Sequence, residues 1–428
     1  MPDLVAELCW RGLVHQTTDD THLPAWLDQG PRTLYAGFDP TADSLHVGSL
    51  LPLLLLRRFQ RAGHRPIAVV GGATGMIGDP SGKSEERNLL SVDRLEQNVH
   101  ALEQQMQRFL DFDPSSREGA VLVNNHDWIR EFSYLEFLRD VGKNFPVGQM
   151  IAKDSVKSRL GRDDGGLSYT EFSYMLLQAF DFVHLYDQFG CELQVGGSDQ
   201  WGNITAGIDL GRRMRRVQLY GLTCPLLTKS DGGKMGKTER GTIWLAPHRT
   251  SPYQFYQYWI QVDDADVGNC LRTLTEIPRD EISALDNAIR EDAGRRESQR
   301  RLAEEMTQLV HGDEGLQIAQ RATRIFFGEE IQRQTDAQLG EIFADVPSQE
   351  LPRLRLGGGG LPLVDALVEA GLSRSKSDAR RTVQQGGAYV NNRRISDIDA
   401  KLGEDDLASE SVMVLRSGKK RYALLRFV

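Results

Sequence analysis

Cysteine is scarce in this chain of 428 residues, and the four that occur, Cys9, Cys191, Cys224 and Cys270, include no Cys-x-x-Cys pair. This spacing predicts neither a zinc site nor a disulfide framework, so we expect reduced, buried thiols and no metal held by the protein. Long apolar runs are lacking, and the first residues form neither a basic nor an apolar segment. We therefore expect a cytoplasmic protein that is neither secreted nor inserted into a membrane.

The charge of the chain is unevenly distributed. The net charge of −9 argues against a nucleic-acid partner, but residues 351–428 carry 14 Lys and Arg against 9 Asp and Glu. Because a phosphate backbone responds to local charge, this basic end is a candidate RNA-facing module. A hydrophobic content of 40% excludes a disordered chain, and the length predicts two or three domains.

Strand and helix patterns alternate over the first half of the chain. Strands are expected at 34–38, 67–70, 121–123 and 192–195, and helices at 46–62, 92–109, 169–186 and 203–214. This alternation predicts an α/β fold with a doubly wound parallel sheet and a ligand at the carboxyl ends of its strands. Beyond Thr250 the periodicity becomes helical and charged, and four consecutive glycines at 357–360 predict a flexible linker.

Two short segments almost two hundred residues apart carry the strongest functional signal. The first runs from Asp39 to Ser49 and includes Thr41, His46 and Gly48, just before an apolar helix whose first N–H groups favour a phosphate. The second, Lys234-Met-Gly-Lys237-Thr238, offers two ammonium groups on a glycine-rich loop. Each alone is typical of a helix cap or a solvated turn. Together and in this order they resemble the HIGH and KMSKS signatures of class I aminoacyl-tRNA synthetases.

A third segment, from Gly78 to Ser84, ends like a phosphate-binding P-loop. Ile77 stands where that loop requires glycine, and Pro80 stiffens its middle, so a P-loop kinase is a weaker alternative. In the synthetase family the segment from Gly71 to Asp79 lines the amino-acid pocket instead. The loop with Lys83 and Arg87 closes over pyrophosphate in that family, and the matching residues are present here.

The surrounding residues resemble the tyrosyl branch of this class. The resemblance implies catalytic roles for Thr41, His46, Gly48, Lys83, Arg87, Lys234, Lys237 and Thr238. It implies ATP contacts from Gly37, Asp39, His46, Gly48, Ser49, Gly196, Asp199 and Lys237. Ser49 replaces the last histidine of the first signature, and Gly236 and Thr238 replace two serines of the second.

One face of the helix expected at 169–186 carries Tyr174, Gln178 and Asp181, which are spaced i, i+4 and i+7. Alternatively, this face simply packs in the hydrophobic core, with polar residues along its edge. In that case a buried carboxylate without a partner would cost a large amount of folding free energy. The resemblance assigns Tyr35 and Asp181 to a substrate phenol, and Tyr174, Gln178 and Asp79 to its ammonium group. Gln200 would contact the carboxylate of the tyrosine substrate.

In this family tyrosine reacts with ATP to give tyrosyl-adenylate and pyrophosphate, and is then transferred to the 3′ end of tRNA(Tyr). ATP with Mg²⁺ on its phosphates is therefore implied. The tail resembles a small RNA-binding domain of ribosomal proteins, and RNA contacts are expected from Arg212, Arg213, Ser373, Arg374, Lys376 and Arg380.

The expected domains are a catalytic one at 1–248, with a dimer-interface insertion at about 125–165, a helical anticodon-side one at 249–346, a linker at 347–360 and an RNA-binding one at 361–428. The segment 132–151 matches the region where the family forms homodimers. Two more alternatives stay open, namely tryptophan specificity and an RNA-binding protein without chemistry.

Overall fold

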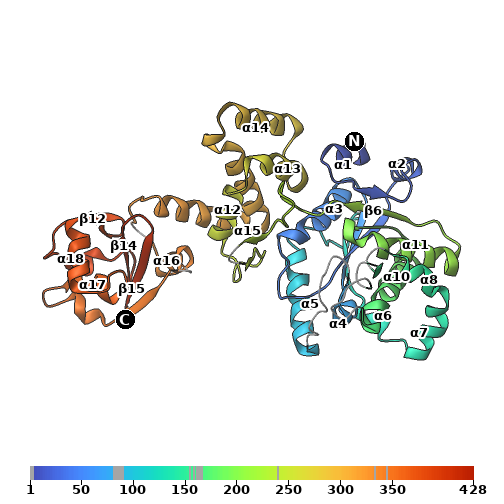
Figure 1. The fold of residues 1–428 in the computed structure, drawn as a ribbon, viewed down its shortest axis with the longest axis horizontal. Helices are drawn as coiled ribbons and strands as arrows, with labels where there is room; N and C mark the ends of the chain where they lie inside the picture. The colour runs from blue at the N-terminus through green and yellow to red at the C-terminus, as the bar shows by residue number, and fades with distance from the viewer. Residues whose placement is uncertain are drawn as a thin grey trace. The chain divides into compact units, whose positions relative to one another are not determined.

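The computed structural model describes residues 4–80, 91–153, 156–157, 160, 167–238, 241–331, 334–343 and 346–428. The chain forms two compact units (Figure 1). The first comprises residues 1–250 and 259–310, and the second comprises 251–258 and 311–428. In the part of the chain that is described, no helix is long and apolar enough to cross a lipid bilayer.

The first unit contains a six-stranded sheet in the order β1-β6-β5-β2-β3-β4. Its strands are β1 (Gln16–Thr17), β2 (Thr33–Phe38), β3 (Arg65–Val70), β4 (Val121–Asn124), β5 (Cys191–Gly197) and β6 (Tyr220–Cys224). All neighbouring strands run parallel except the short β1, which is antiparallel to β6. The predicted parallel α/β sheet is confirmed, although the expectation omitted β1 and β6.

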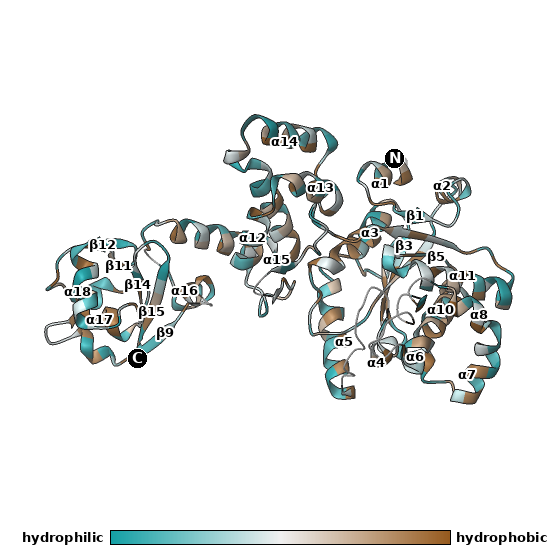
Figure 2. Cartoon of the chain, in the orientation of Figure 1, coloured by the Kyte–Doolittle hydropathy of each residue, from teal (hydrophilic) through white to brown (hydrophobic). Residues whose placement is uncertain are grey.

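Helices flank this sheet (Figure 1). They are α1 (Leu4–Trp10), α2 (His22–Asp28), α3 (Leu50–Arg61), α4 (Thr74–Ile77), α5 (Val92–Met106), α6 (His126–Ile129), α7 (Tyr134–Asp140), α8 (Val147–Ile151), α10 (Tyr169–Phe189) and α11 (Trp201–Arg215). Helix α5 alternates between teal and brown in Figure 2, because its buried residues Leu95, Val99, Leu102 and Met106 share one face. Helix α10 begins where the Ser168 side chain accepts a hydrogen bond from the Glu171 N–H, and ends at Gly190 with φ of 62°.

The cysteines follow the expectation at three of four positions. Cys191, Cys224 and Cys270 are buried, whereas Cys9 is exposed at the surface, and all four are free thiols.

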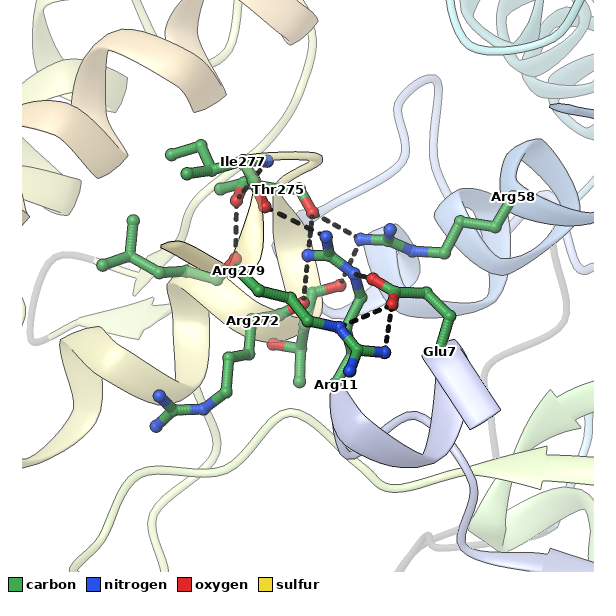
Figure 3. A network of polar contacts seen from close by, with 9 residues as sticks. Glu7, Arg11, Arg58, Arg272, Thr275, Ile277 and Arg279 are labelled. Atoms are coloured by element: carbon green, nitrogen blue, oxygen red, sulfur yellow. Dashed lines mark hydrogen bonds and ion pairs between the residues drawn. The ribbon is translucent and has the colours of Figure 1, made fainter. Parts of the chain in front are cut away.

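The helices α13 (Asp264–Leu274) and α14 (Arg279–Asp292) belong to the first unit, although the sequence predicted a separate helical domain. Figure 3 shows the contacts that hold them. Arg11 donates to the carbonyls of Arg272 and Thr275 at 3.1 and 2.9 Å, and Arg58 donates to Thr275 O at 2.6 Å. Glu7 accepts a bond from Arg11 at 2.7 Å. Two guanidinium groups thus meet the C-terminal end of α13, where the helix dipole favours positive charge.

Helix α15 (Glu297–Phe326) is interrupted at Gly312, whose φ of 73° and ψ of −177° are not helical. The boundary between the two units falls next to this residue. The later turns of α15, together with α12 (Pro252–Ile260), which spans the other boundary, and α16 (Asp336–Ile342), contribute to the second unit. The expected helical domain is therefore divided between two units.

The second unit contains a five-stranded sheet in the order β12-β11-β14-β15-β9. Its strands are β9 (Ser348–Leu351), β11 (Ala388–Val390), β12 (Arg393–Ile395), β14 (Val412–Ser417) and β15 (Arg421–Phe427), and its helices include α17 (Leu363–Glu369) and α18 (Lys376–Gln384). The short β10 (Leu361–Pro362) and β13 (Lys401–Leu402) pair separately. β9 pairs in parallel with β15, so the start of the segment expected as a flexible linker is instead a strand. The buried Leu351 and Phe427 share one apolar core, which explains why the chain stays bound here.

The described residues of the second unit form at least two apolar cores. One contains residues of α17 and α18, such as Leu367 and Val383. The other combines Ile325 of α15 and Phe343 with Val412 and Tyr422 of the sheet. Because helices from residues 311–343 cover sheet residues that would otherwise contact water, the RNA-binding domain expected at 361–428 shares a core with them.

The turn between β11 and β12 reinforces this contact. Asn391 and Asn392 have φ of 48° and 63°, as a two-residue hairpin turn of type I′ requires. The buried Asn392 amide donates to the carbonyls of Ile325 and Glu329 at 2.7 and 2.8 Å. Ile325 lies in the last turn of α15, and its carbonyl also accepts the Gly328 N–H at 2.9 Å and the Tyr422 hydroxyl at 3.3 Å, whereas Glu329 lies just beyond the helix.

Replacing Asn392 with glycine keeps the left-handed backbone but removes both donated bonds. We expect the second unit to lose about 1–3 kcal/mol, since each of the two hydrogen bonds is worth about 0.5–1.5 kcal/mol. N392A should lose about 1–2 kcal/mol more, because a Cβ is strained in this conformation. Hydrogen exchange of the full-length protein measures this through the opening of residues 388–395. Equal protection in all three proteins would contradict the assignment.

Candidate active site

A cavity of about 360 Å³ lies at the carboxyl ends of β2, β3 and β5, and residues of both signature segments line it. The predicted residues in its lining are Tyr35, Gly37, Asp39, Thr41, His46, Gly48, Ser49, Asp79, Tyr174, Gln178, Asp181, Gly196, Asp199, Gln200, Lys234 and Lys237. The fold therefore brings together segments almost two hundred residues apart, at the sheet edge where α/β proteins bind ligands.

Backbone contacts join the two signatures. The N–H of Val47 donates to Ile243 O at 3.1 Å, and the N–H of Ile243 donates to Gly236 O at 2.8 Å. Gly236 has φ of 83°, and a Cβ placed on it would lie 2.9 Å from the Cβ of Val47. A serine here would be strained in backbone and packing alike, which explains the glycine in the second signature.

The His46 ring lies beside the start of α3. A Cβ on Gly48 would lie 2.8 Å from Cε1 of His46, so glycine leaves room for the ring. On its other side the ring meets Trp244 edge to face, with centroids 6.1 Å apart. Since Val47–Ser49 form a 3₁₀ turn that leads into α3, this end of the cavity presents a helix N-terminus, which favours negatively charged ligands.

The carboxylate of Asp181 is buried at the other end of the cavity. It accepts hydrogen bonds from Nδ2 of Asn125 at 3.0 Å and from Nε1 of Trp128 at 2.8 Å. Burial raises the pKa of Asp181 to about 7; the two donors oppose this rise and the nearby Asp39 adds to it. Neither Asn125 nor Trp128 was predicted as a site residue. Both lie within five residues after the strand predicted at 121–123, at the sheet edge where a ligand is expected.

Several buried polar atoms in the cavity have no hydrogen-bond partner among the described residues. They are the hydroxyl of Tyr35 and the Oε1 atoms of Gln178 and Gln194. Burial, and next the charge of Asp181, raise the pKa of Tyr35 well above its ordinary value. An unpaired buried polar group costs about 1–3 kcal/mol, so these atoms are suited to a ligand that supplies the missing partners.

Gln194 was not predicted as a site residue. Its strand β5 pairs with β2 so that Gln194 lies opposite Tyr35, and it is 2% exposed. Gln194 lies within the strand predicted at 192–195, and a polar residue in a buried strand indicates a functional role.

A second set of hydrogen bonds orients the remaining pocket residues. The hydroxyl of Tyr174 donates to Oδ2 of Asp39 at 3.1 Å. The amide of Gln178 donates to Gln200 at 3.2 Å, and Gln200 in turn donates to Oδ2 of Asp79 at 2.7 Å. Residues from four separate segments thus hold one another in position.

Asp199 lies next to this set. Burial raises the pKa of Asp199, and the charge of Asp79 adds to the rise, while bonds from the Asp199 N–H and Gln200 and the charge of Lys234 oppose it.

One predicted catalytic residue that the structure describes, Thr238, does not line the cavity. Thr238 is exposed, and its hydroxyl donates to Gly241 O at 3.1 Å. Lys83 and Arg87 lie outside the described residues.

The predicted RNA contacts lie elsewhere. Arg213 donates to Asn144 O at 2.7 Å and to Gln149 at 2.9 Å, and Arg212 forms an ion pair with Asp209. In the second unit Arg374, Lys376 and Arg380 are exposed, but Ser373 is 6% exposed and its hydroxyl is buried, which disfavours a direct RNA contact.

The chain matches known families along most of its length. Residues 27–328 match the family model "tRNA synthetases class I (W and Y)", and residues 338–425 match the model "Tyrosine--tRNA ligase SYY-like C-terminal domain". The chain is 61% identical to a tyrosine–tRNA ligase of Rhodopirellula baltica, over 99% of this chain and 96% of that one. It is 50% identical to a tyrosine–tRNA ligase of Roseiflexus castenholzii, over the full length of both.

Solved structures agree with these matches. A truncated mitochondrial tyrosyl-tRNA synthetase of Aspergillus nidulans superimposes with a TM-score of 0.67 at 30% identity, covering 76% of this chain and 94% of that one.

The raised pKa of Asp181 predicts a pH dependence of stability. The folded chain holds a proton on Asp181 at pH values where the unfolded chain, with an ordinary pKa of 3.8, has lost it. This contribution to stability is therefore full below about pH 4 and falls as pH rises to about 7, by roughly 4 kcal/mol. D181N does not titrate, so its stability should fall less steeply across this window. Denaturant unfolding at several pH values measures the difference, and parallel curves for both proteins would contradict the assignment.

Proposed function

The chain belongs to the tyrosyl-tRNA synthetases of class I and is a tyrosine–tRNA ligase, and from this premise we propose how its residues bind and activate the two substrates. One observation carries the proposal. The unpaired hydroxyl of Tyr35 and the buried carboxylate of Asp181 line the same cavity as the lysines of the second signature. A phenolic substrate and a nucleotide would thus meet in one site.

Tyrosine would enter with its side chain toward β2 and α10. Its phenol would donate to Asp181 and accept from Tyr35, which supplies the partner that the Tyr35 hydroxyl lacks. Oε1 of Gln178 would accept from the substrate ammonium, together with Asp79 and Tyr174. Gln200 would contact the substrate carboxylate. Phenylalanine would leave these buried groups unpaired, so the pocket would reject it.

ATP would bind at the opposite end, where the turn before α3 presents N–H groups and His46. Thr41, Gly48 and Ser49 would line the phosphates there, while Gly37, Asp39, Gly196 and Asp199 would face the nucleoside. This arrangement is supported by the lining of the cavity and by the helix N-terminus within it.

Activation needs no general base in this proposal. The substrate carboxylate is already ionised at neutral pH and attacks the α-phosphorus, and the bond to pyrophosphate breaks. His46, Lys234 and Lys237 would stabilise the negative charge on the phosphate oxygens, with Lys83, Arg87 and Thr238 acting on pyrophosphate. Mg²⁺ would arrive on the ATP phosphates.

RNA binding belongs to the same proposal. The exposed Arg374, Lys376 and Arg380 offer cations to the phosphates of tRNA(Tyr), and Arg212 is exposed as well. Arg213 is engaged by Asn144 and Gln149, so we assign it mainly to supporting the segment around α8. We propose that residues 249–346 lie on the side of the protein that faces the tRNA anticodon. We also propose that the protein is located in the cytoplasm.

Substituting Tyr35 with phenylalanine tests the pocket. The variant loses one hydrogen bond to the substrate phenol, worth about 0.5–1.5 kcal/mol, so the Kd for tyrosine should rise roughly two- to tenfold. Its ligand-free stability should not fall, because the hydroxyl has no partner there. Tyrosine-dependent exchange of pyrophosphate into ATP and thermal unfolding measure the two effects.

D181A should lose most of this exchange activity. Near-normal exchange in D181A, or a less stable ligand-free Y35F, would contradict the pocket. Exchange with tryptophan, ATP hydrolysis without an amino acid, or RNA binding without exchange would instead support the three alternative functions.

We also propose a homodimer. Large apolar side chains on α7, α8 and the start of α10 are exposed to solvent. They are Tyr134, Leu135, Val147, Ile151 and Tyr169. The hydroxyls of Tyr134 and Tyr169 lie 3.3 Å apart. Exposed apolar side chains that gather in this way mark protein interfaces.

L135D places a charge on this apolar region and should convert the dimer to a monomer of 48.0 kDa. Leu354 in the second unit is 91% exposed and lies outside this apolar region, so L354D is the matched control and should stay dimeric. Light scattering after gel filtration measures both masses. A wild-type monomer, or a dimer that survives L135D, would contradict the interface.

A further inference from the structure

The second signature loop is anchored to a helix outside the cavity. Oδ1 of Asp266 on α13 accepts the backbone N–H of Ser230 at 2.7 Å. One turn later, Sγ of Cys270 lies 3.5 Å from Sδ of Met235, the residue between Lys234 and Gly236. Asp266 is 6% exposed and Cys270 is fully buried. Since residues four apart share a face, one face of α13 touches both Ser230, which precedes the signature, and Met235, which lies within it.

The loop itself is a short hairpin. Thr228 and Lys234 form an antiparallel bridge, and the N–H of Met235 donates to Leu227 O at 3.0 Å. Ser230 therefore lies in the turn of this hairpin, between Thr228 and Lys234. A shift of Ser230 would be transmitted directly to Lys234, which lines the cavity.

The opposite end of α13 is fixed to the body of the first unit. Arg11 and Arg58 donate to the carbonyls at its C-terminal end (Figure 3), and they belong to the segment after α1 and to α3. α3 is also the helix whose N-terminus lies at the cavity. The helix that holds the loop is thus attached to the helix that faces the phosphates.

We propose that Asp266 is a positioning residue for tyrosine activation. It touches no substrate. By accepting the Ser230 N–H it holds the hairpin so that Lys234 and Lys237 meet the phosphates of ATP, and the contact between Cys270 and Met235 supports the same placement. This inference rests on the proposed function, in which those lysines stabilise the leaving pyrophosphate.

The test compares two substitutions in the full-length protein. D266A removes the acceptor, whereas D266N keeps an oxygen that can accept the same N–H. In tyrosine-dependent exchange we expect D266A to lower kcat/KM for ATP roughly 10- to 100-fold, a cost typical of a misplaced catalytic group, and D266N to restore most of it. The Kd for tyrosine should stay unchanged in both, because the tyrosine pocket does not contact α13. Hydrogen exchange should show a faster Ser230 amide in D266A alone.

Asp263 provides the matched control. It is an exposed acid at the same helix end whose side chain makes no capping bond, so D263A should match the wild type. If D266A does not fold, C270A tests the same face and should lower kcat/KM for ATP in the same direction.

Two results would overturn the inference. One is wild-type kinetics in D266A. The other is an equal loss of tyrosine binding and ATP use, which would indicate a purely structural role. K234A and K237A separate this outcome from failure of the proposed function, because full activity in both would reject the role of the lysines themselves.

Discussion

The burial of one carboxylate constrains the whole catalytic unit. Asp181 lies within a sheet-facing helix, and an ionised or unpaired carboxyl there would cost several kcal/mol. Asn125 and Trp128 supply its two donors, and both follow β4. They reach Asp181 only because β4 is placed beside β3, so the strand order and the polarity of the cavity depend on each other. A change in sheet order would leave Asp181 without partners.

Much of this arrangement is predictable from local sequence, and the rest depends on contacts between distant segments. The strands β2, β3, β4 and β5 read clearly as apolar runs between helices. β1, with two residues, and β6, which contains Gly221, carry too little local signal to be recognised. Asn125 and Trp128 were missed for a different reason. They follow a predicted strand, but their partner Asp181 lies 56 and 53 residues later in the sequence, so only the folded sheet shows which group they bond.

The second unit shows why composition misjudges a linker. Gly358, Gly359 and Gly360 have φ of 63°, 120° and 79°, so the glycines do form an irregular segment, as expected. The residues just before them pair with β15, because Leu351 lies opposite Phe427 and both enter the same core. Amino-acid composition indicates how flexible an isolated segment is. Whether residues 348–351 are ordered depends instead on their pairing with β15, more than seventy residues later in the chain.

The two halves of the candidate active site are built on different kinds of structural element. The unpaired atoms of Tyr35, Gln178 and Gln194 make the ligand-free cavity less stable by about 1–3 kcal/mol each. They sit on β2, β5 and α10, elements whose apolar faces are buried and whose positions are therefore well determined. Lys234 instead closes a hairpin of few residues, with Lys237 three residues later, and a helix outside the cavity holds this segment by one buried carboxylate and one sulfur contact. The side chains that would bind the tyrosine substrate thus lie on the sheet and on α10, whose positions are fixed by buried packing. The lysines that would stabilise the leaving pyrophosphate lie on a loop whose position depends on its contacts with α13.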